Sequence, residues 1–166
     1  MRLLRAVLCL VITTGLAPAS PFSDLGSPLQ EVRTHAAELI CNDHLYRATP
    51  RAPWDEMIST LKKGDSAEIF VTRLQKKGLL RDFTATDFAH PGVWRIRLDD
   101  SWVLLCTMND SQLTEYKIVE EPKEIQVEPP SNYSGFWRTY RINGKLACLY
   151  DYQNGRNLGN TLHMSP

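Results

Sequence analysis

The hydrophobic pattern of the chain changes its period near Phe83, and this change constrains the fold more than any other feature. Before it, apolar residues recur at the three-and-four spacing of amphipathic helices. After it, they alternate with polar residues as in half-buried strands. Helices followed by strands joined through short turns predict an α+β fold. We therefore expect N-terminal helices packed on one face of an antiparallel β-meander sheet.

Three segments in the first half have the residues of helix starts and ends. The first begins near Pro28. The second, Trp54–Lys63, follows a proline, ends in two lysines and is stopped by a glycine. The third begins at Asp65, which stands three residues before Glu68 in a capping-box-like pattern.

The second half predicts six strands separated by turn residues. Asn143-Gly144 is the strongest hairpin signal and predicts a type I′ turn, whereas Asn154-Gly155 is taken as the end of the last strand. One strand face is expected to point toward the helices, and it carries Trp102, Leu104, Cys106 and Met108.

The first nineteen residues predict a secretory signal peptide. A positive start with Arg2 and Arg5 precedes an uncharged apolar run and the small-residue site Ala17-Pro18-Ala19. The run is too short to cross a bilayer, so we expect a secreted, extracellular protein without a membrane anchor. The organisation predicted for the chain is a signal peptide (1–19), a flexible mature N-terminus (20–27), a single α+β domain (28–155) and an irregular C-terminal tail (156–166).

The predicted mature chain has no excess of positive charge. The full sequence has 19 basic and 19 acidic residues, and loss of Arg2 and Arg5 leaves a net charge of about −2. Such a balance argues against DNA as a partner and makes RNA an improbable one, because polyanion binding relies on a basic field.

Three cysteines remain after signal removal, namely Cys41, Cys106 and Cys148. In an oxidising compartment two of them are expected to form a disulfide and the third to stay a buried thiol. Three pairings are possible. We favour a link from Cys41 to the sheet, because it would close a long loop. The sequons at Asn109 and Asn132 lie in predicted turns and are candidate glycosylation sites.

Two groups of side chains are candidate binding residues. Arg95 and Arg97 share a strand face and could bind an anion, although a solvated sheet face would look the same. Tyr133 and Trp137 flank a corner after two prolines, where exposed aromatic residues contact partner proteins. The alternative for this corner is that the rings pack beneath it. No spacing typical of a metal site or of a cofactor-binding loop is present, so we expect no metal and no cofactor.

With a signal peptide, few cysteines and no enzyme motif, the chain resembles the small secreted effector proteins of plant-pathogenic fungi. Its order of cysteine, helix, antiparallel sheet and cysteine is similar to the ribonuclease-like effectors of mildews, with Cys41, Trp54–Lys63 and Cys148 in those places. The resemblance implies a virulence role and a structural use of the two cysteines.

Two functions follow from these features. The first is a non-catalytic effector or interaction protein that binds an extracellular or host protein. The alternative is a secreted ribonuclease-like hydrolase, which needs a base, an acid and a cation at one phosphate. Glu115 and Arg95 are candidates for that set, but His90 and His163 lie in predicted loops.

Overall fold

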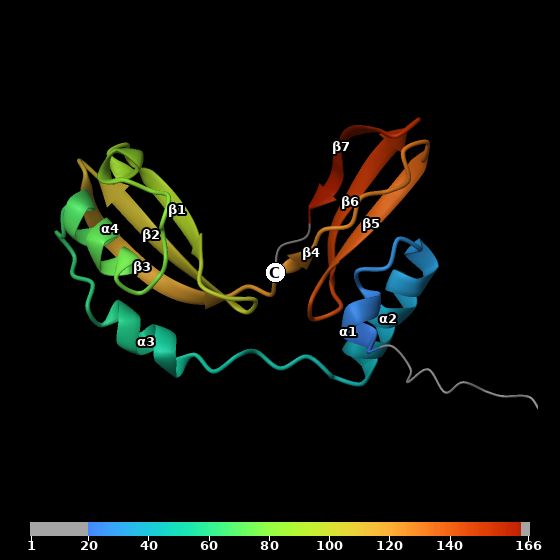
Figure 1. The fold of residues 1–166 in the computed structure, drawn as a ribbon, viewed down its shortest axis with the longest axis horizontal. Coiled ribbons are helices and arrows are strands. Elements are labelled where there is room, and N and C mark those ends of the chain that lie inside the picture. The colour runs from blue at the N-terminus through green and yellow to red at the C-terminus, as the bar shows by residue number, and fades with distance from the viewer. Residues whose placement is uncertain (1–19, 164–166) are drawn as a thin grey trace, which may run out of the picture.

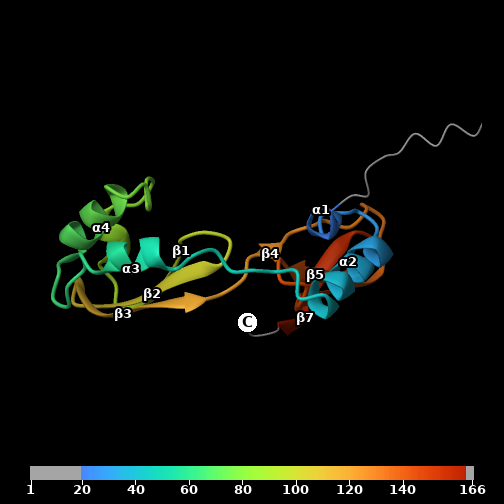
Figure 2. The ribbon, with the colours of Figure 1, turned by 90° about the horizontal axis from the view of Figure 1, so that it is seen from below.

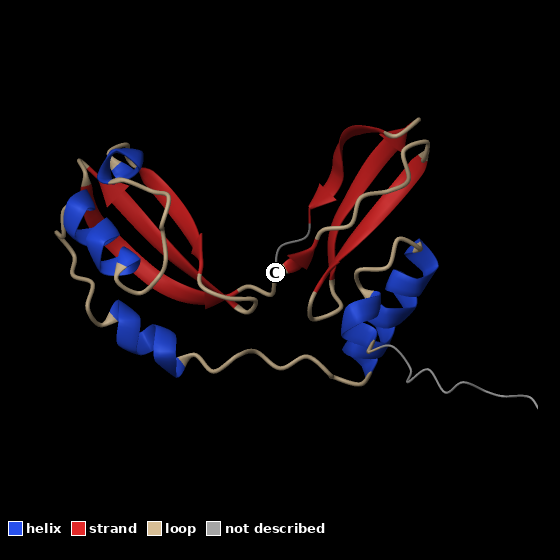
Figure 3. Ribbon diagram, viewed as in Figure 1, coloured by secondary structure: helices blue, strands red, loops and turns tan. Residues whose placement is uncertain are grey.

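The computed structural model describes residues 20–163, so the predicted signal peptide lies outside the described residues. The described chain forms two lobes, and each has its own antiparallel sheet and its own helices (Figures 1 and 3). The α+β fold is confirmed, and the long helices precede the strands. The strands divide between two sheets, however, where the sequence predicted one.

The first lobe holds a three-stranded sheet in the order β1-β2-β3, and the second a four-stranded sheet in the order β4-β5-β6-β7. The elements of the first lobe are α3 (Ala52–Ile58), α4 (Ala67–Gln75), η1 (Ala85–Phe88), β1 (Gly92–Arg97), β2 (Trp102–Asn109) and β3 (Gln112–Glu120). Those of the second are α1 (Pro21–Asp24), α2 (Gln30–Asn42), β4 (Glu124–Ile125), β5 (Gly135–Arg141), β6 (Leu146–Gln153) and β7 (Arg156–His163).

The second lobe is built from two separate segments of the chain. The chain begins there with α1 and α2, crosses through the extended segment 43–51, builds the whole first lobe, and returns through 121–123 to form the second sheet (Figure 1). The first lobe is therefore inserted between the helices and the strands of the second. In the first lobe, α3 and α4 lie on the same side of the sheet (Figure 2).

The first lobe has an apolar core between its helices and its sheet. Leu104, Cys106 and Met108 of β2 are buried in it, which confirms the predicted inward face. Phe88 is fully buried, and its ring lies 4.6 Å from Trp94 and 5.4 Å from Phe70 between centroids. Because these three rings come from α4, η1 and β1, their contacts hold the helices on this face of the sheet.

The second lobe has a smaller apolar core and a buried arginine. Its apolar cluster is built from Leu25, Ala36, Ala37, Ile40 and Tyr140. Arg33 of α2 is fully buried, donates to the carbonyls of Ser27 and Arg138, and lies 3.9 Å from the centroid of the Trp137 ring. This side chain joins the N-terminal helices to β5.

Two segments predicted to lack regular structure contain a helix and a strand. Residues 20–27, predicted to be loose, contain α1, and Leu25 is buried because it packs on α2. The tail 156–166, predicted to be irregular, contains β7 over Arg156–His163. Asn154 and Gly155 both have positive φ, so they form the two-residue turn that starts β7.

The turn between β5 and β6 differs from its prediction. Gly144 has a φ of +81°, but Asn143 does not lie in the positive-φ region that a type I′ turn requires. The amide of Gly144 donates to Arg141, and the amide of Arg141 donates to Lys145, so the loop is one residue longer. A β-carbon on Gly144 would lie 2.5 Å from the Ala37 carbonyl oxygen, which lets only glycine pack against α2 here.

Candidate functional site

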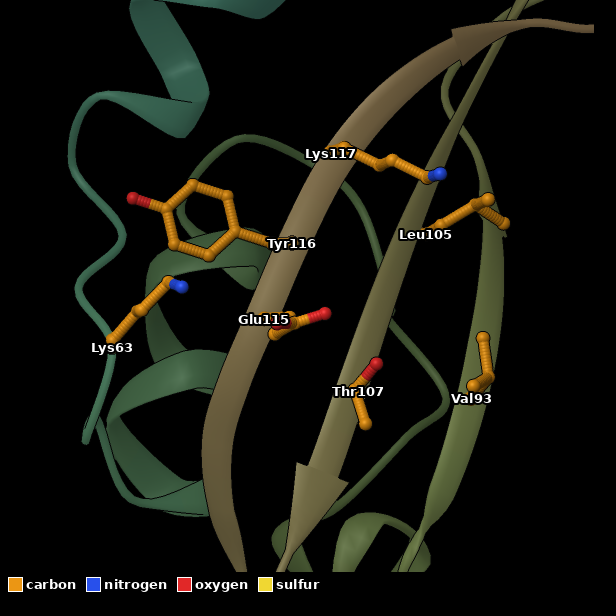
Figure 4. Close-up of a pocket in the computed structure, with 7 residues that line it drawn as sticks. All are labelled: Lys63, Val93, Leu105, Thr107, Glu115, Tyr116 and Lys117. Carbon is orange, nitrogen blue, oxygen red and sulfur yellow. The ribbon is translucent and has the colours of Figure 1, made fainter.

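The face of the first sheet that carries no helix has an open groove. Strand alternation places Val93, Leu105, Thr107, Glu115 and Lys117 on this face, and they line a groove of about 470 Å³ (Figure 4). Val93 is 68% exposed. Lys63 and Tyr116 form the rim beyond β3, where the Tyr116 hydroxyl donates to the Leu61 carbonyl at 2.9 Å.

The predicted binding residues Arg95 and Arg97 lie on the same face. Both guanidinium groups contact the carboxylate of Glu121, and Arg97 also donates to the Glu121 carbonyl at 2.9 Å. Glu121 follows β3 and its side chain is mostly buried, whereas the Arg95 side chain is 58% exposed. Two cations thus share one carboxylate, and the guanidinium of Arg95 stays within reach of an external anion.

This face is more basic than the chain as a whole. The charged residues of the groove, its rim and the adjoining Arg95–Arg97–Glu121 cluster are four cations, Lys63, Arg95, Arg97 and Lys117, and two anions, Glu115 and Glu121. The whole sequence has equal numbers of basic and acidic residues. The face therefore complements an acidic surface, although the protein is not basic overall.

The edge strand β1 borders a second, apolar groove. The amide of Leu98 donates to the Trp102 carbonyl at 3.0 Å, which continues the register between β1 and β2. By strand alternation, the backbone groups of Trp94 and Ile96 therefore point toward β2, and those of Val93, Arg95 and Arg97 point outward. Beside this edge lies a groove of about 260 Å³, lined by Leu79, Leu80, Phe83, Phe88 and Trp94 together with β1 residues 95–97.

The wall of this second groove is held in place from α4. The Gln75 side-chain amide donates to the carbonyls of Leu80 and Phe83 at 3.2 and 2.9 Å. Leu80 has a φ of +53°, a conformation that costs a leucine roughly 1–2 kcal/mol. This groove was not predicted from the sequence, where the apolar pair Leu79-Leu80, outside any predicted element, was the signal for it.

The corner between Tyr133 and Trp137 is packed, in agreement with the alternative given for it. Trp137 is only 2% exposed, its indole Nε1 donates to the Val127 carbonyl, and Tyr133 meets its ring edge-on at 5.1 Å. Phe136, 52% exposed, is the aromatic residue of this corner that faces solvent. Phe136, and not the buried Trp137, is therefore the residue of this corner that could contact a partner.

The predicted disulfide is not present. Cys41, Cys106 and Cys148 form no disulfide with one another, and Cys106 lies in the first lobe while the other two lie in the second. Burial raises the pKa of Cys106 to about 12 and also raises the pKa of Cys148. The sequon residues Asn109 and Asn132 are both exposed, and their glycosylation stays a prediction.

The residues considered for RNA cleavage are spread over the fold. Glu115 lies in a groove whose lining contains no histidine and no arginine. His90 precedes β1, and His163 ends β7 opposite Cys148 in the other sheet. Within residues 20–163, no three histidine, cysteine, aspartate or glutamate side chains are grouped so that they could hold a metal ion.

No family model matches the chain, and neither a curated protein nor a solved structure is significantly similar to it. The resemblance to fungal effectors therefore stays a prediction. Among the described helices, none has the length and apolar character needed to cross a membrane.

Proposed function

We propose that the chain is a secreted, non-catalytic interaction protein that binds an extracellular or host protein through the helix-free face of its first sheet. The observation that carries this proposal is the groove on that face, which combines exposed Val93 and half-buried Leu105 with charged Glu115 and Lys117. An apolar centre with a charged rim is the composition of a protein-binding surface.

The charge of the face defines the partner. Four cations against two anions favour a partner with acidic residues around an apolar contact. Arg95 suits this role because a guanidinium binds a carboxylate through two parallel hydrogen bonds. Virulence, if the source is a pathogen, would follow from the identity of that partner.

The experiment is affinity capture of the tagged, secreted protein from culture medium or host tissue, with wild type and Leu105→Asp compared side by side. A partner that is retained by wild type and lost by Leu105→Asp supports the proposal, provided that circular dichroism shows the variant folded. Phe136→Asp is the matched control, because it places the same charge on an exposed aromatic position of the other lobe.

The same samples are assayed for RNA cleavage. Cleavage that is abolished by Glu115→Gln would contradict the proposal and favour the hydrolase alternative. Capture of the same proteins by wild type and by Leu105→Asp would also contradict it, because binding would then not use this face.

A further inference from the structure

We infer that β1 takes an extended acidic–apolar peptide of the partner as an added fourth strand of the first sheet. This inference rests on the proposed function and specifies how the partner is held. It concerns the outer edge of β1 and the apolar groove beside it, both of which lie in the first lobe.

The backbone at this edge is available for pairing. The outward amide and carbonyl groups of Val93, Arg95 and Arg97 form no hydrogen bond with any described residue. At the opposite edge, near the start of β3, Leu113 exchanges hydrogen bonds with Gly64 and Asp65. The β3 edge is covered only there, and the outward backbone groups of Tyr116 and Ile118 form no hydrogen bond with described residues. The β1 edge differs because its row of unpaired groups lies beside an apolar groove, and such a row is a template for another strand.

The groove beside the edge gives the added strand its side-chain specificity. Its lining residues Leu79, Leu80 and Phe83 come from the loop before η1, and Phe83 is 43% exposed. A volume of about 260 Å³ accommodates one or two large apolar side chains. The hydrogen bonds from Gln75 hold this wall before any ligand arrives, which lowers the entropy cost of binding.

Strand alternation then fixes the sequence pattern of the peptide. Successive side chains of an added strand point to opposite faces of the sheet. The side chains on the helix side would enter the apolar groove, which Trp94 helps to line. Those on the other side would lie beside Arg95 and Arg97, whose guanidinium groups share the carboxylate of Glu121. The complementary peptide alternates apolar residues with Asp or Glu, and either strand direction satisfies this pattern.

The test uses the mature full-length protein and a fluorescent heptapeptide in which Leu and Glu alternate. We expect saturable micromolar binding by wild type. A peptide of the same composition with its leucines and glutamates in separate blocks should bind at least tenfold more weakly, because it cannot fill the groove and face the arginines together. Equal binding of both peptides would overturn the inference in favour of simple charge attraction.

Val93→Pro removes one outward amide without touching the β1–β2 ladder, since proline is tolerated where the amide faces away from the sheet. The peptide would then lose its hydrogen bond to the amide of residue 93 and its regular strand pairing there, which should weaken peptide binding about tenfold. Val93→Ala is the matched control and should change binding less than about twofold. Phe83→Ser should weaken peptide binding while circular dichroism shows an unchanged sheet. If Phe83 served only to stabilise the fold, the substitution would not weaken binding in a protein that is still folded.

The outcomes separate this inference from the proposed function. A captured partner that is lost by Leu105→Asp but kept by Val93→Pro would leave the proposed function standing and overturn strand addition. Failure of the alternating peptide to bind at millimolar concentration would overturn it as well. A concentration-dependent dimer that Val93→Pro abolishes would replace the partner peptide with a second copy of this chain.

Discussion

The two lobes of the molecule are stabilised in different ways. The first is built from one continuous stretch of chain around an apolar core of helices and sheet. The second joins an N-terminal helical pair to C-terminal strands and relies on a small apolar cluster and the buried Arg33. In this molecule, the lobe whose parts are far apart in sequence has the smaller apolar cluster, and a buried arginine donating to two backbone carbonyls joins those parts.

The first and largest effect is expected from Phe88→Ala in the first lobe. The ring is fully buried between Phe70 and Trp94, so its loss leaves a cavity and should lower the free energy of unfolding by about 3–5 kcal/mol. Urea denaturation measures this change. Phe136→Ala, at an exposed position, is the control and should stay within about 0.5 kcal/mol of wild type.

Amide hydrogen exchange on the same variant tests the comparison directly. If the lobes unfold separately, Phe88→Ala raises exchange in β1, β2 and β3 and leaves β5 and β6 unchanged. Equal increases in both sheets would show that the two lobes form one cooperative unit.

The second effect is expected from Arg33→Ala in the second lobe. The substitution removes the donor to the Ser27 and Arg138 carbonyls and the contact with the Trp137 ring, and it should cost roughly 2–4 kcal/mol. Hydrogen exchange should rise in β5 and β6. Arg156→Ala, at an exposed position of β7, is the matched control. If Arg33→Ala left the free energy of unfolding unchanged, the cost of burying the guanidinium would equal the stabilisation from its hydrogen bonds and its contact with the Trp137 ring.

The third effect concerns the segment that joins the lobes. Asp99 accepts hydrogen bonds from Thr49 and from the Trp54 indole, each at 2.7 Å, and from the amides of Ser101 and Trp102. These bonds attach the crossing segment 43–51 to the first lobe. Asp99→Asn should cost about 1–2 kcal/mol and speed tryptic cleavage after Arg47 or Arg51.

The same residue predicts a pH dependence. Burial alone would raise the pKa of Asp99, but hydrogen bonds from Ser101, Thr49, Trp54 and Trp102 outweigh it and lower that pKa. A carboxyl with a lowered folded-state pKa stabilises the fold above its unfolded pKa, about 4, and loses this contribution as the pH falls further. The stability difference between wild type and Asp99→Asn should therefore shrink below about pH 4. A difference that is constant from pH 7 to pH 3 would contradict this assignment.

The smallest effect distinguishes the cysteines. Burial raises the pKa of Cys106 to about 12, so its thiol should resist alkylation of the native protein at neutral pH. Cys41 is partly exposed and should react first. Mass spectrometry of native and unfolded samples measures the order of labelling. A disulfide detected in the purified protein without reductant would support the sequence-based prediction.

Local pattern was sufficient to predict most elements of the fold. The three long helices and six of the strands follow from apolar spacing, prolines, glycines and turn residues. Arg95 and Arg97 were placed on one face because strand alternation is a local rule. The strand β7 was missed although Asn154-Gly155 precedes it, because its residues are mostly polar, include a glycine and pair with β6 through two register shifts, so they do not alternate between apolar and polar.

The sequence by itself determined the α+β class, the order of the elements and the inward face of β2, because each depends on contacts between residues near in the chain. Only the tertiary structure decided that the strands form two sheets, that Arg33 is buried beside Trp137, and that the β1 edge borders an apolar groove. These features depend on pairings between distant segments, and the free energy that selects such pairings comes from packing that no local pattern records.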